Sequence, residues 1–216
     1  MGGHRLTVFR ILLVFLLLEY TIAYDRFRIR PFRIGSLMAG YRLLTIVGLL
    51  LVSVCFVHAQ DAGMERAKEL LLPFKQGLQT ALREGMAQGP VQAIDACHIQ
   101  APGIAEGMAA GGIQVGRTSD RLRNPDNASP EWVSPILEQY LASTAEREPR
   151  IVQLEDDRVG YVEPISLQPL CLTCHGETLA PDVASKINEL YPGDRATGYV
   201  AGDLRGVFWI DFPARQ

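Results

Sequence analysis

An apolar run over residues 43–57, directly preceded by Arg42, constrains this chain more than any other feature. A positive residue, a short apolar stretch and small or β-branched residues before a cleavage point are typical of a secretory signal peptide. Because Val57-His58-Ala59 precedes Gln60, we expect cleavage after Ala59 and a mature chain of 157 residues. The alternative is an uncleaved membrane anchor, since the run approaches the ~20 residues needed to span a bilayer.

A second apolar run, over residues 11–18, lies further upstream. Residues 1–37 are interpreted either as the product of a start codon placed too early or as a second membrane helix. In both cases residues 1–59 form an extension, and residues 60–216 form the folded domain on the far side of a membrane. We therefore expect a periplasmic protein, with an inner-membrane anchor as the alternative.

The charge distribution separates the same two regions. The whole chain has a net charge of −3, but residues 60–216 hold 14 basic and 22 acidic residues, a net charge of −8. Phosphate binding needs a basic face, so this acidic domain is not expected to bind nucleic acid.

The first part of the domain has helical periodicity. Apolar residues recur every three or four positions on one face of an expected amphipathic helix: Met64, Ala67, Leu71, Phe74, Leu78 and Leu82. Pro73 predicts a kink in this helix, and Gly89-Pro90 predicts its end. A short second helix is expected over residues 90–100, stopped by Pro102 and Gly103.

The second part of the domain alternates strands with one helix. Residues 113–118, 150–155, 159–167 and 207–212 are predicted strands, with Asp156-Asp157 as a hairpin turn. Ser129 is expected to cap a helix that has Pro130 in its first turn and that buries Val133, Ile136, Leu137, Tyr140 and Leu141. Helices followed by mostly antiparallel strands predict an α+β domain.

The sequence Cys171-Leu172-Thr173-Cys174-His175 is the attachment pattern of haem c. Two thiols three residues apart on a helical turn reach the two vinyl groups of one haem, and the next residue places an imidazole under the iron. We weigh this above a redox dithiol, half a zinc site or chance. A zinc site needs two further ligands, and only Cys97 and His98 remain in the domain. We expect one covalent haem with His175 as its proximal ligand.

The residue on the opposite side of the iron is left open by spacing. The candidates are Cys97, His98, Met64, Met86 and Met108, or no protein ligand. Adjacent helical residues point about 100° apart, so Cys97 and His98 cannot both reach the iron. The apolar side of the helix expected over residues 90–100 is centred slightly nearer to His98 than to Cys97, so periodicity alone slightly favours His98.

Several motifs, in their order along the chain, resemble a family of single-haem proteins long catalogued as a domain of unknown function. They are Ile94-Asp95-Ala96-Cys97 with Ala101-Pro102, Arg117-Thr118-Ser119, Arg123-Asn124-Pro125, Cys171-Leu172-Thr173-Cys174-His175-Gly176 and Gly206-Val207-Phe208-Trp209. The resemblance covers about residues 61–213. It implies a PAS-like antiparallel sheet flanked by helices, and a haem c held between His175 and an unusual thiolate ligand, Cys97.

A thiolate opposite histidine predicts a low reduction potential and a six-coordinate low-spin ferric state, because a thiolate donates electron density strongly. Protonation on reduction is expected to weaken the iron–sulfur bond and open a site for a gas. Arg117, Arg121 and Arg123 are candidate partners of the haem propionates, since guanidinium matches carboxylate geometry. The alternative for these arginines is a solvated basic loop.

Three functions follow from these features. The first is a redox or gas sensor read by a partner protein. The second is an electron-transfer cytochrome, which the charge of −8 would direct to a basic redox partner. The third is a haem enzyme acting on peroxide or nitrogen oxides. The enzyme ranks last, because His98 is the only other histidine in the domain that could act as a distal acid or base. Whether the protein is an enzyme is therefore left open.

Overall fold

The computed structural model describes residues 35–143 and 147–214, with side chains described from residue 61 onward. The chain divides into two units at residues 55 and 56, and the second is described below. The expected signal peptide or anchor, residues 1–59, lies outside the residues whose side chains are described, so it stays a prediction. Among the helices searched within the described residues, none is long and apolar enough to cross a membrane.

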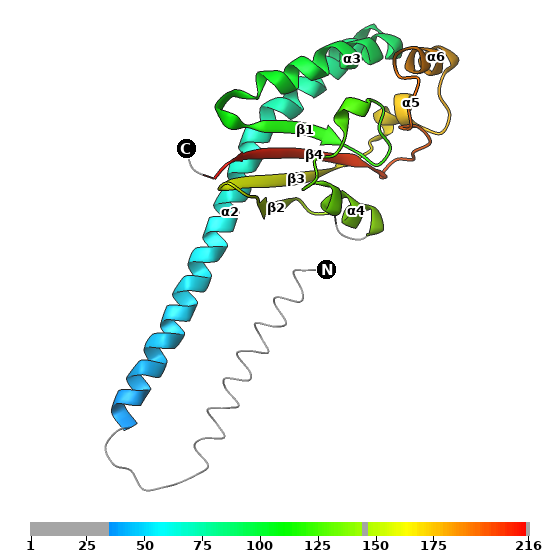
Figure 1. Cartoon of the computed structure of the whole chain (residues 1–216). Coiled ribbons are helices and arrows are strands. Elements are labelled where there is room, and N and C mark those ends of the chain that lie inside the picture. Colours follow the sequence, from blue (N-terminus) through cyan, green and yellow to red (C-terminus); the bar gives the residue numbers. More distant parts are fainter. Residues whose placement is uncertain (1–34, 144–146, 215–216) are drawn as a thin grey trace. The chain divides into compact units, whose positions relative to one another are not determined.

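A four-stranded antiparallel sheet forms the centre of the second unit (Figure 1). Its strands lie in the order β1-β4-β3-β2. Their bounds are Gln114–Thr118 for β1, Arg150–Gln153 for β2, Arg158–Ser166 for β3 and Leu204–Pro213 for β4. The expected α+β class, with an antiparallel sheet flanked by helices and an amphipathic N-terminal helix, is confirmed. This strand order is consistent with the PAS-like expectation.

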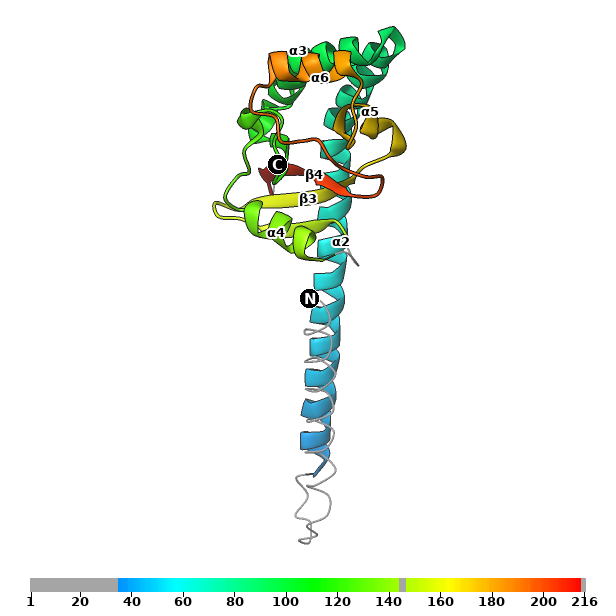
Figure 2. The same ribbon diagram turned by 90° about the vertical axis from the view of Figure 1, so that its right-hand side faces the viewer.

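The part of α2 (Gly35–Gln88) that belongs to this unit and α3 (Pro90–Gly107) cover one face of the sheet (Figure 2). The predicted face of α2 is buried there: Ala67, Leu71, Phe74 and Leu78 pack against Val115, Tyr161, Ile210 and Phe212 of the strands. Pro73 lies inside α2, and the helix continues past it to Gln88. The expected end at Gly89-Pro90 is confirmed.

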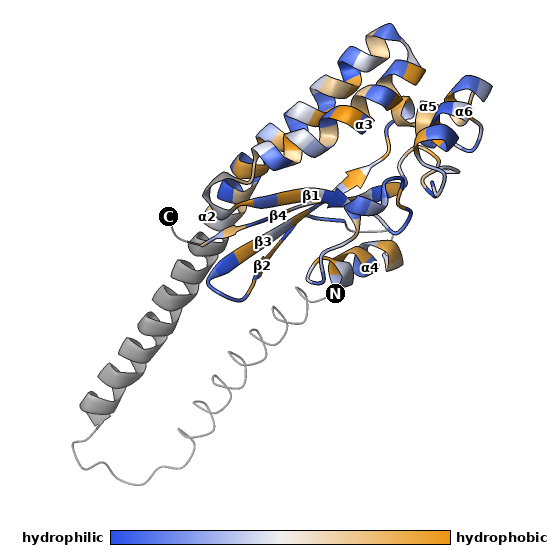
Figure 3. Cartoon of the chain, turned by 45° about the horizontal axis from the view of Figure 1, so that its top comes forward, coloured by the Kyte–Doolittle hydropathy of each residue, from blue (hydrophilic) through white to orange (hydrophobic). Residues whose placement is uncertain are grey.

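Helix α4 (Ser134–Ala142) covers the opposite face. Its buried side consists of Ile136, Leu137 and Tyr140, which with Val133 pack against Val162, Leu204 and Val207 of the sheet. Figure 3 shows hydrophilic and hydrophobic residues interspersed along α3, as in a helix with one buried side. β4 therefore has an apolar side chain in each core layer, which explains its alternating sequence.

The hairpin between β2 and β3 is confirmed. Asp156 and Asp157 both have φ of 54°, as a two-residue type I′ turn requires. Aspartate tolerates this left-handed conformation better than most residues, because its short side chain bonds locally.

Two predicted helix boundaries are wrong. α3 continues through Pro102 to Gly107, because Ala101, Ile104 and Ala105 in its second half pack on the main core, and this packing overrides the helix-breaking tendency of proline. α4 begins at Ser134 and not at Pro130, and Ser129 bonds the Pro130 carbonyl instead of capping the helix. Leu141, expected in the core, is exposed.

A compact region between β3 and β4 contains the attachment pattern. The 3-10 helix η3 (Pro169–Cys171) leads directly into the short helix α5 (Leu172–His175), which is followed by α6 (Pro181–Leu190). α6 buries Val183 and Ile187 against Ile94 of α3, so α3 and α6 lie side by side (Figure 2). This packing brings Cys97 on α3 toward the region that holds Cys171, Cys174 and His175.

Candidate functional site

One cavity of about 380 Å³ brings together six of the residues singled out from the sequence. Its wall is built from α2, α3, the end of β1, the end of β3, β4 and the η3–α5 segment. The six residues are Cys97, Arg117, Arg123, Cys171, Cys174 and His175. They come from four separate stretches of the chain, so their convergence is a property of the fold.

The η3–α5 segment places the two thiols on one side of a helical turn. Cys171 ends η3 and Cys174 lies three residues later in α5, and residues three apart on a helix are neighbours on its surface. The segment closes with the Gly176 amide donating to the Leu172 carbonyl at 2.9 Å. A Cβ at Gly176 would lie 2.6 Å from that carbonyl oxygen, so only glycine fits there.

The His175 ring is fixed by one hydrogen bond. Its Nδ1 lies 2.7 Å from the Ala196 carbonyl oxygen, and because a carbonyl only accepts, Nδ1 carries the proton. Burial, reinforced by Arg123 and Arg205, lowers the pKa of His175 to about 3. The imidazole is therefore neutral with Nε2 free, which is the form that binds a metal.

Arg123 holds the segment on which these groups sit. Its guanidinium forms an ion pair with Asp194 at 3.1 Å and donates to the Cys174 carbonyl at 2.6 Å. Asp194 in turn accepts from the Ala196 amide at 3.0 Å. The same network thus positions the thiols and the carbonyl that orients His175. Arg123 was expected to bind a haem propionate. In the structure its guanidinium donates instead to Asp194 and to the Cys174 carbonyl.

Two other cations in the cavity have no carboxylate partner among the described residues. The Arg117 guanidinium has no hydrogen bond or ion pair with any described residue, and the Arg205 guanidinium donates only to the Arg121 carbonyl among them, at 3.3 Å. Burial lowers the pKa of both guanidinium groups. Thr118, which is 4% exposed, also lines the cavity, and its buried hydroxyl has no hydrogen-bond partner in the part of the chain that the structure describes. These groups make the cavity suited to a ligand with anionic oxygens.

The candidates for the second iron ligand are separated by the fold. Cys97 and Met86 line the cavity, whereas His98 is exposed and its Nδ1 lies 3.0 Å from the Tyr191 hydroxyl. Met64 and Met108 pack on the core between α2 and the sheet. The slight lean of the helix periodicity toward His98 was wrong, since α6 packs along α3 and sets which of its sides faces inward.

The environment of Cys97 is mixed. Burial raises the pKa of its thiol, and the charges of Arg117 and Arg123 oppose this shift. A bound metal ion is what would turn such a thiol into a thiolate. Burial also raises the pKa of Cys174.

Sequence reasoning missed Arg205 and Tyr191 as cavity residues and expected Arg121 there. Arg121 instead stacks over the Tyr199 ring, 3.9 Å from its centroid, and donates to the Arg195 carbonyl. Arg205 lies one residue before the Gly206-Val207-Phe208-Trp209 motif, so the motif marked the right strand. Strand periodicity alone does not tell which face of a sheet end meets a cavity.

Comparison with known proteins gives one family. The family model described as Tll0287-like matches residues 58–213. The solved structures include the "Crystal structure of the cyanobacterial heme-protein Tll0287", which is 30% identical over 54% of this chain and 73% of its own, with a TM-score of 0.45. Among curated proteins, none matches the chain significantly.

Proposed function

The chain belongs to the Tll0287-like family, whose model matches residues 58–213, and on that premise we propose that it is an exported haem protein. One haem c is attached to Cys171 and Cys174, with His175 as proximal ligand. The observation that carries this proposal is the convergence on one cavity of two neighbouring thiols and a neutral imidazole whose Nε2 is free. When bound, haem supplies reversible one-electron chemistry and a metal that accepts small ligands.

The residues present fit this group. The cavity, of about 380 Å³, lies within the range of cofactor pockets. Ile94, Leu78 and Phe208 provide an apolar lining, while Arg117 and Arg205 provide two cations without carboxylate partners. Haem has the same division, with an apolar ring and two propionates. We assign the propionates to Arg117 and Arg205, and the bracing of the attachment segment to Arg123.

Cys97 is the proposed second axial ligand. It lines the cavity from α3, on a different element from His175, and Arg117 beside it favours its ionised form. A histidine–thiolate pair gives a low reduction potential and a low-spin ferric state. Met86 is the alternative ligand from the same cavity.

The proposed role is sensing of redox state or of a diatomic gas, read by a partner protein. A thiolate bond that weakens on reduction supplies the change that such a sensor needs. Electron transfer is the second candidate, favoured by the net charge of −8 on residues 60–216 and by Leu170, which lines the cavity and is 55% exposed. His98, the expected distal acid–base residue of an enzyme, is exposed and does not line the cavity.

Expression in a host that matures c-type cytochromes tests the proposal. Protein that keeps a haem stain on a denaturing gel, with the mass of one haem added to a chain beginning at Gln60, supports it. The Cys171→Ala, Cys174→Ala double variant should lose the stain. Colourless wild-type protein at the mass of the chain alone would overturn the proposal. If the haem is present, carbon monoxide or nitric oxide binding after reduction favours sensing, whereas rapid electron exchange without ligand binding favours electron transfer.

A further inference from the structure

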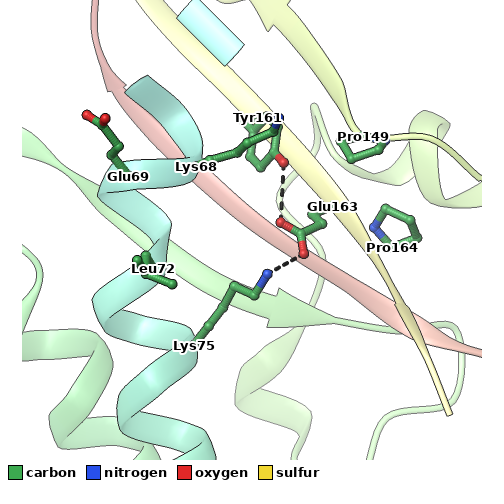
Figure 4. A pocket seen from close by; sticks show the side chains of 8 residues that line it. All are labelled: Lys68, Glu69, Leu72, Lys75, Pro149, Tyr161, Glu163 and Pro164. Atoms are coloured by element: carbon green, nitrogen blue, oxygen red, sulfur yellow. Dashed lines mark hydrogen bonds and ion pairs between the residues drawn. The ribbon is translucent and has the colours of Figure 1, made fainter. Parts of the chain in front are cut away.

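A second, open groove of about 560 Å³ is shown in Figure 4. It lies between α2 and β3 and is lined by Lys68, Glu69, Leu72, Lys75, Pro149, Tyr161, Glu163 and Pro164. The function proposed above makes no use of it.

The groove and the cavity follow one another along the same pair of elements. On α2, Leu72 and Lys75 line the groove, and Lys75, Leu78 and Leu82 line the cavity. On β3, Tyr161, Glu163 and Pro164 line the groove, and Ile165 and Ser166 line the cavity. Lys75 is the one residue that lines both. The two spaces are therefore consecutive parts of a single seam between α2 and β3.

An ion pair lies in this seam at Lys75, the residue that lines both spaces. The Lys75 ammonium binds the Glu163 carboxylate, and the buried Tyr161 hydroxyl donates to the other carboxylate oxygen at 3.2 Å. Figure 4 shows the three side chains in line across the groove. Tyr161 is fully buried, so its hydroxyl holds Glu163 from the core side. Among the described residues, the Lys75 ammonium contacts only Glu163 and the Phe208 ring, whose centroid is 5.7 Å away.

We propose that the groove is the entrance through which small uncharged molecules reach the haem cavity, and that Lys75, paired with Glu163, is its gate. This inference rests on the proposed haem. Lys75 and Glu163 side chains are 26% and 23% exposed, so water reaches the pair and lets it open. Lys75 is a flexible, single-point donor, which swings out of the seam without any movement of α2 or β3.

The association rate of an added iron ligand tests the gate. The protein is loaded with haem and carries Cys97→Ala, so that release of the thiolate does not set the rate. Imidazole is mixed with the ferric protein and carbon monoxide with the ferrous protein, and binding is followed by absorption. Lys75→Met should raise the imidazole rate about fivefold, the effect expected for loss of a partly exposed ion pair, and the smaller carbon monoxide should gain less.

Ionic strength supplies a readout that a merely structural role would not move. Salt screens a partly exposed pair, so the imidazole rate should rise with salt when Lys75 is present and stay flat in Lys75→Met. Lys75→Arg should retain the slow, salt-dependent entry. Lys68→Met is the matched control, because Lys68 lines the same groove but pairs with Glu65 on its own helix.

The outcomes separate this proposal from the one on which it rests. Absence of bound haem defeats the proposed function. With haem bound, equal imidazole association rates for Lys75→Met, Lys68→Met and the Cys97→Ala parent would show that Lys75 does not control entry. So does a large slowing by Leu170→Trp at the other exposed part of the cavity, because ligands would then enter there. Lys75→Met must keep the circular dichroism of its parent, and the Glu163→Gln variant should reproduce its faster entry.

Discussion

The Nδ1 atom of His175 lies 2.7 Å from the carbonyl oxygen of Ala196, across a distance of 21 residues in the chain. A histidine ligand depends on such a partner, because the bond fixes both the tautomer and the plane of the ring. The Ala196 backbone is itself fixed by its amide donating to Asp194, which also holds Arg123. The segment after α6 is thus a structural part of the site, although it contributes no ligand.

Loss of Asp194 should therefore damage stability and ligation together. The Arg123 and Asp194 side chains are only 14% and 9% exposed, and breaking a buried pair by removing one partner costs about 3 kcal/mol. We expect Asp194→Asn to lower the free energy of unfolding by that order in urea titrations. The control is Asp95→Asn, which removes a surface pair with Lys186 and should cost under about 1 kcal/mol. Equal losses in both variants would contradict the proposed network.

The arginines of the cavity should differ in what they control. Arg117 and Arg205 have no carboxylate partner among the described residues, so their charge is available to the bound group. A nearby cation favours the reduced haem, because reduction makes the haem more negative by one charge. Arg117→Gln and Arg205→Gln should each lower the midpoint potential on the order of 40 mV, equivalent to about 1 kcal/mol for one electron.

Two comparisons check this assignment by redox titration. Arg83→Gln, at an exposed position of α2 outside the cavity lining, should leave the potential within a few millivolts. Arg123→Gln should reduce stability in the manner of Asp194→Asn. A potential that responds to Arg123→Gln alone would return the propionate role to Arg123.

The second iron ligand can be identified by three substitutions on two helices. Cys97→Ala should convert the low-spin ferric spectrum to a different ligation state, visible in absorption and electron paramagnetic resonance. His98→Ala should leave the spectrum unchanged, because His98 is exposed and bonded to Tyr191. Met86→Leu should also leave the spectrum unchanged, and it keeps the apolar volume of the cavity wall. Spectra that change with Met86→Leu but not with Cys97→Ala would make Met86 the ligand.

The features predicted well from the sequence are those fixed by local chemistry. The Asp156-Asp157 turn follows from aspartate's tolerance of positive φ, and the inward face of α2 follows from 3.6-residue periodicity. The helical turn expected at residues 171–175 is likewise local, and the structure has it as the end of η3 followed by α5.

The features predicted poorly depend on contacts between distant segments. α3 continues past Pro102 because Ile104 packs against α2 at Gly77. The exposure of His98 and the placement of Cys97 at the cavity depend on how α6 packs along α3. α6 itself has a local signal that the sequence analysis did not use, because Pro181 precedes Val183, Ile187 and Leu190 at helical spacing. The pair of Arg123 with Asp194 was not predicted, because the two residues are 71 positions apart and no local pattern links them.

The close crossing of α2 and α3, which forms one wall of the cavity, depends on a glycine. A Cβ at Gly85 would lie 2.5 Å from the Ala93 Cα atom, a backbone atom that cannot turn aside. Gly85→Ala should therefore push the helices apart, and overpacking of this kind costs about 1–3 kcal/mol. Since Met86, Ala93 and Ile94 line the cavity, the haem absorption band should broaden as well.

Gly103→Ala on α3 is the matched control, because nothing lies within 4 Å of its added methyl group. It should gain up to about 1 kcal/mol from helix propensity. Thermal unfolding of both variants measures the difference, and a stabilised Gly85→Ala protein would show that the two helices do not cross as closely as the structure places them.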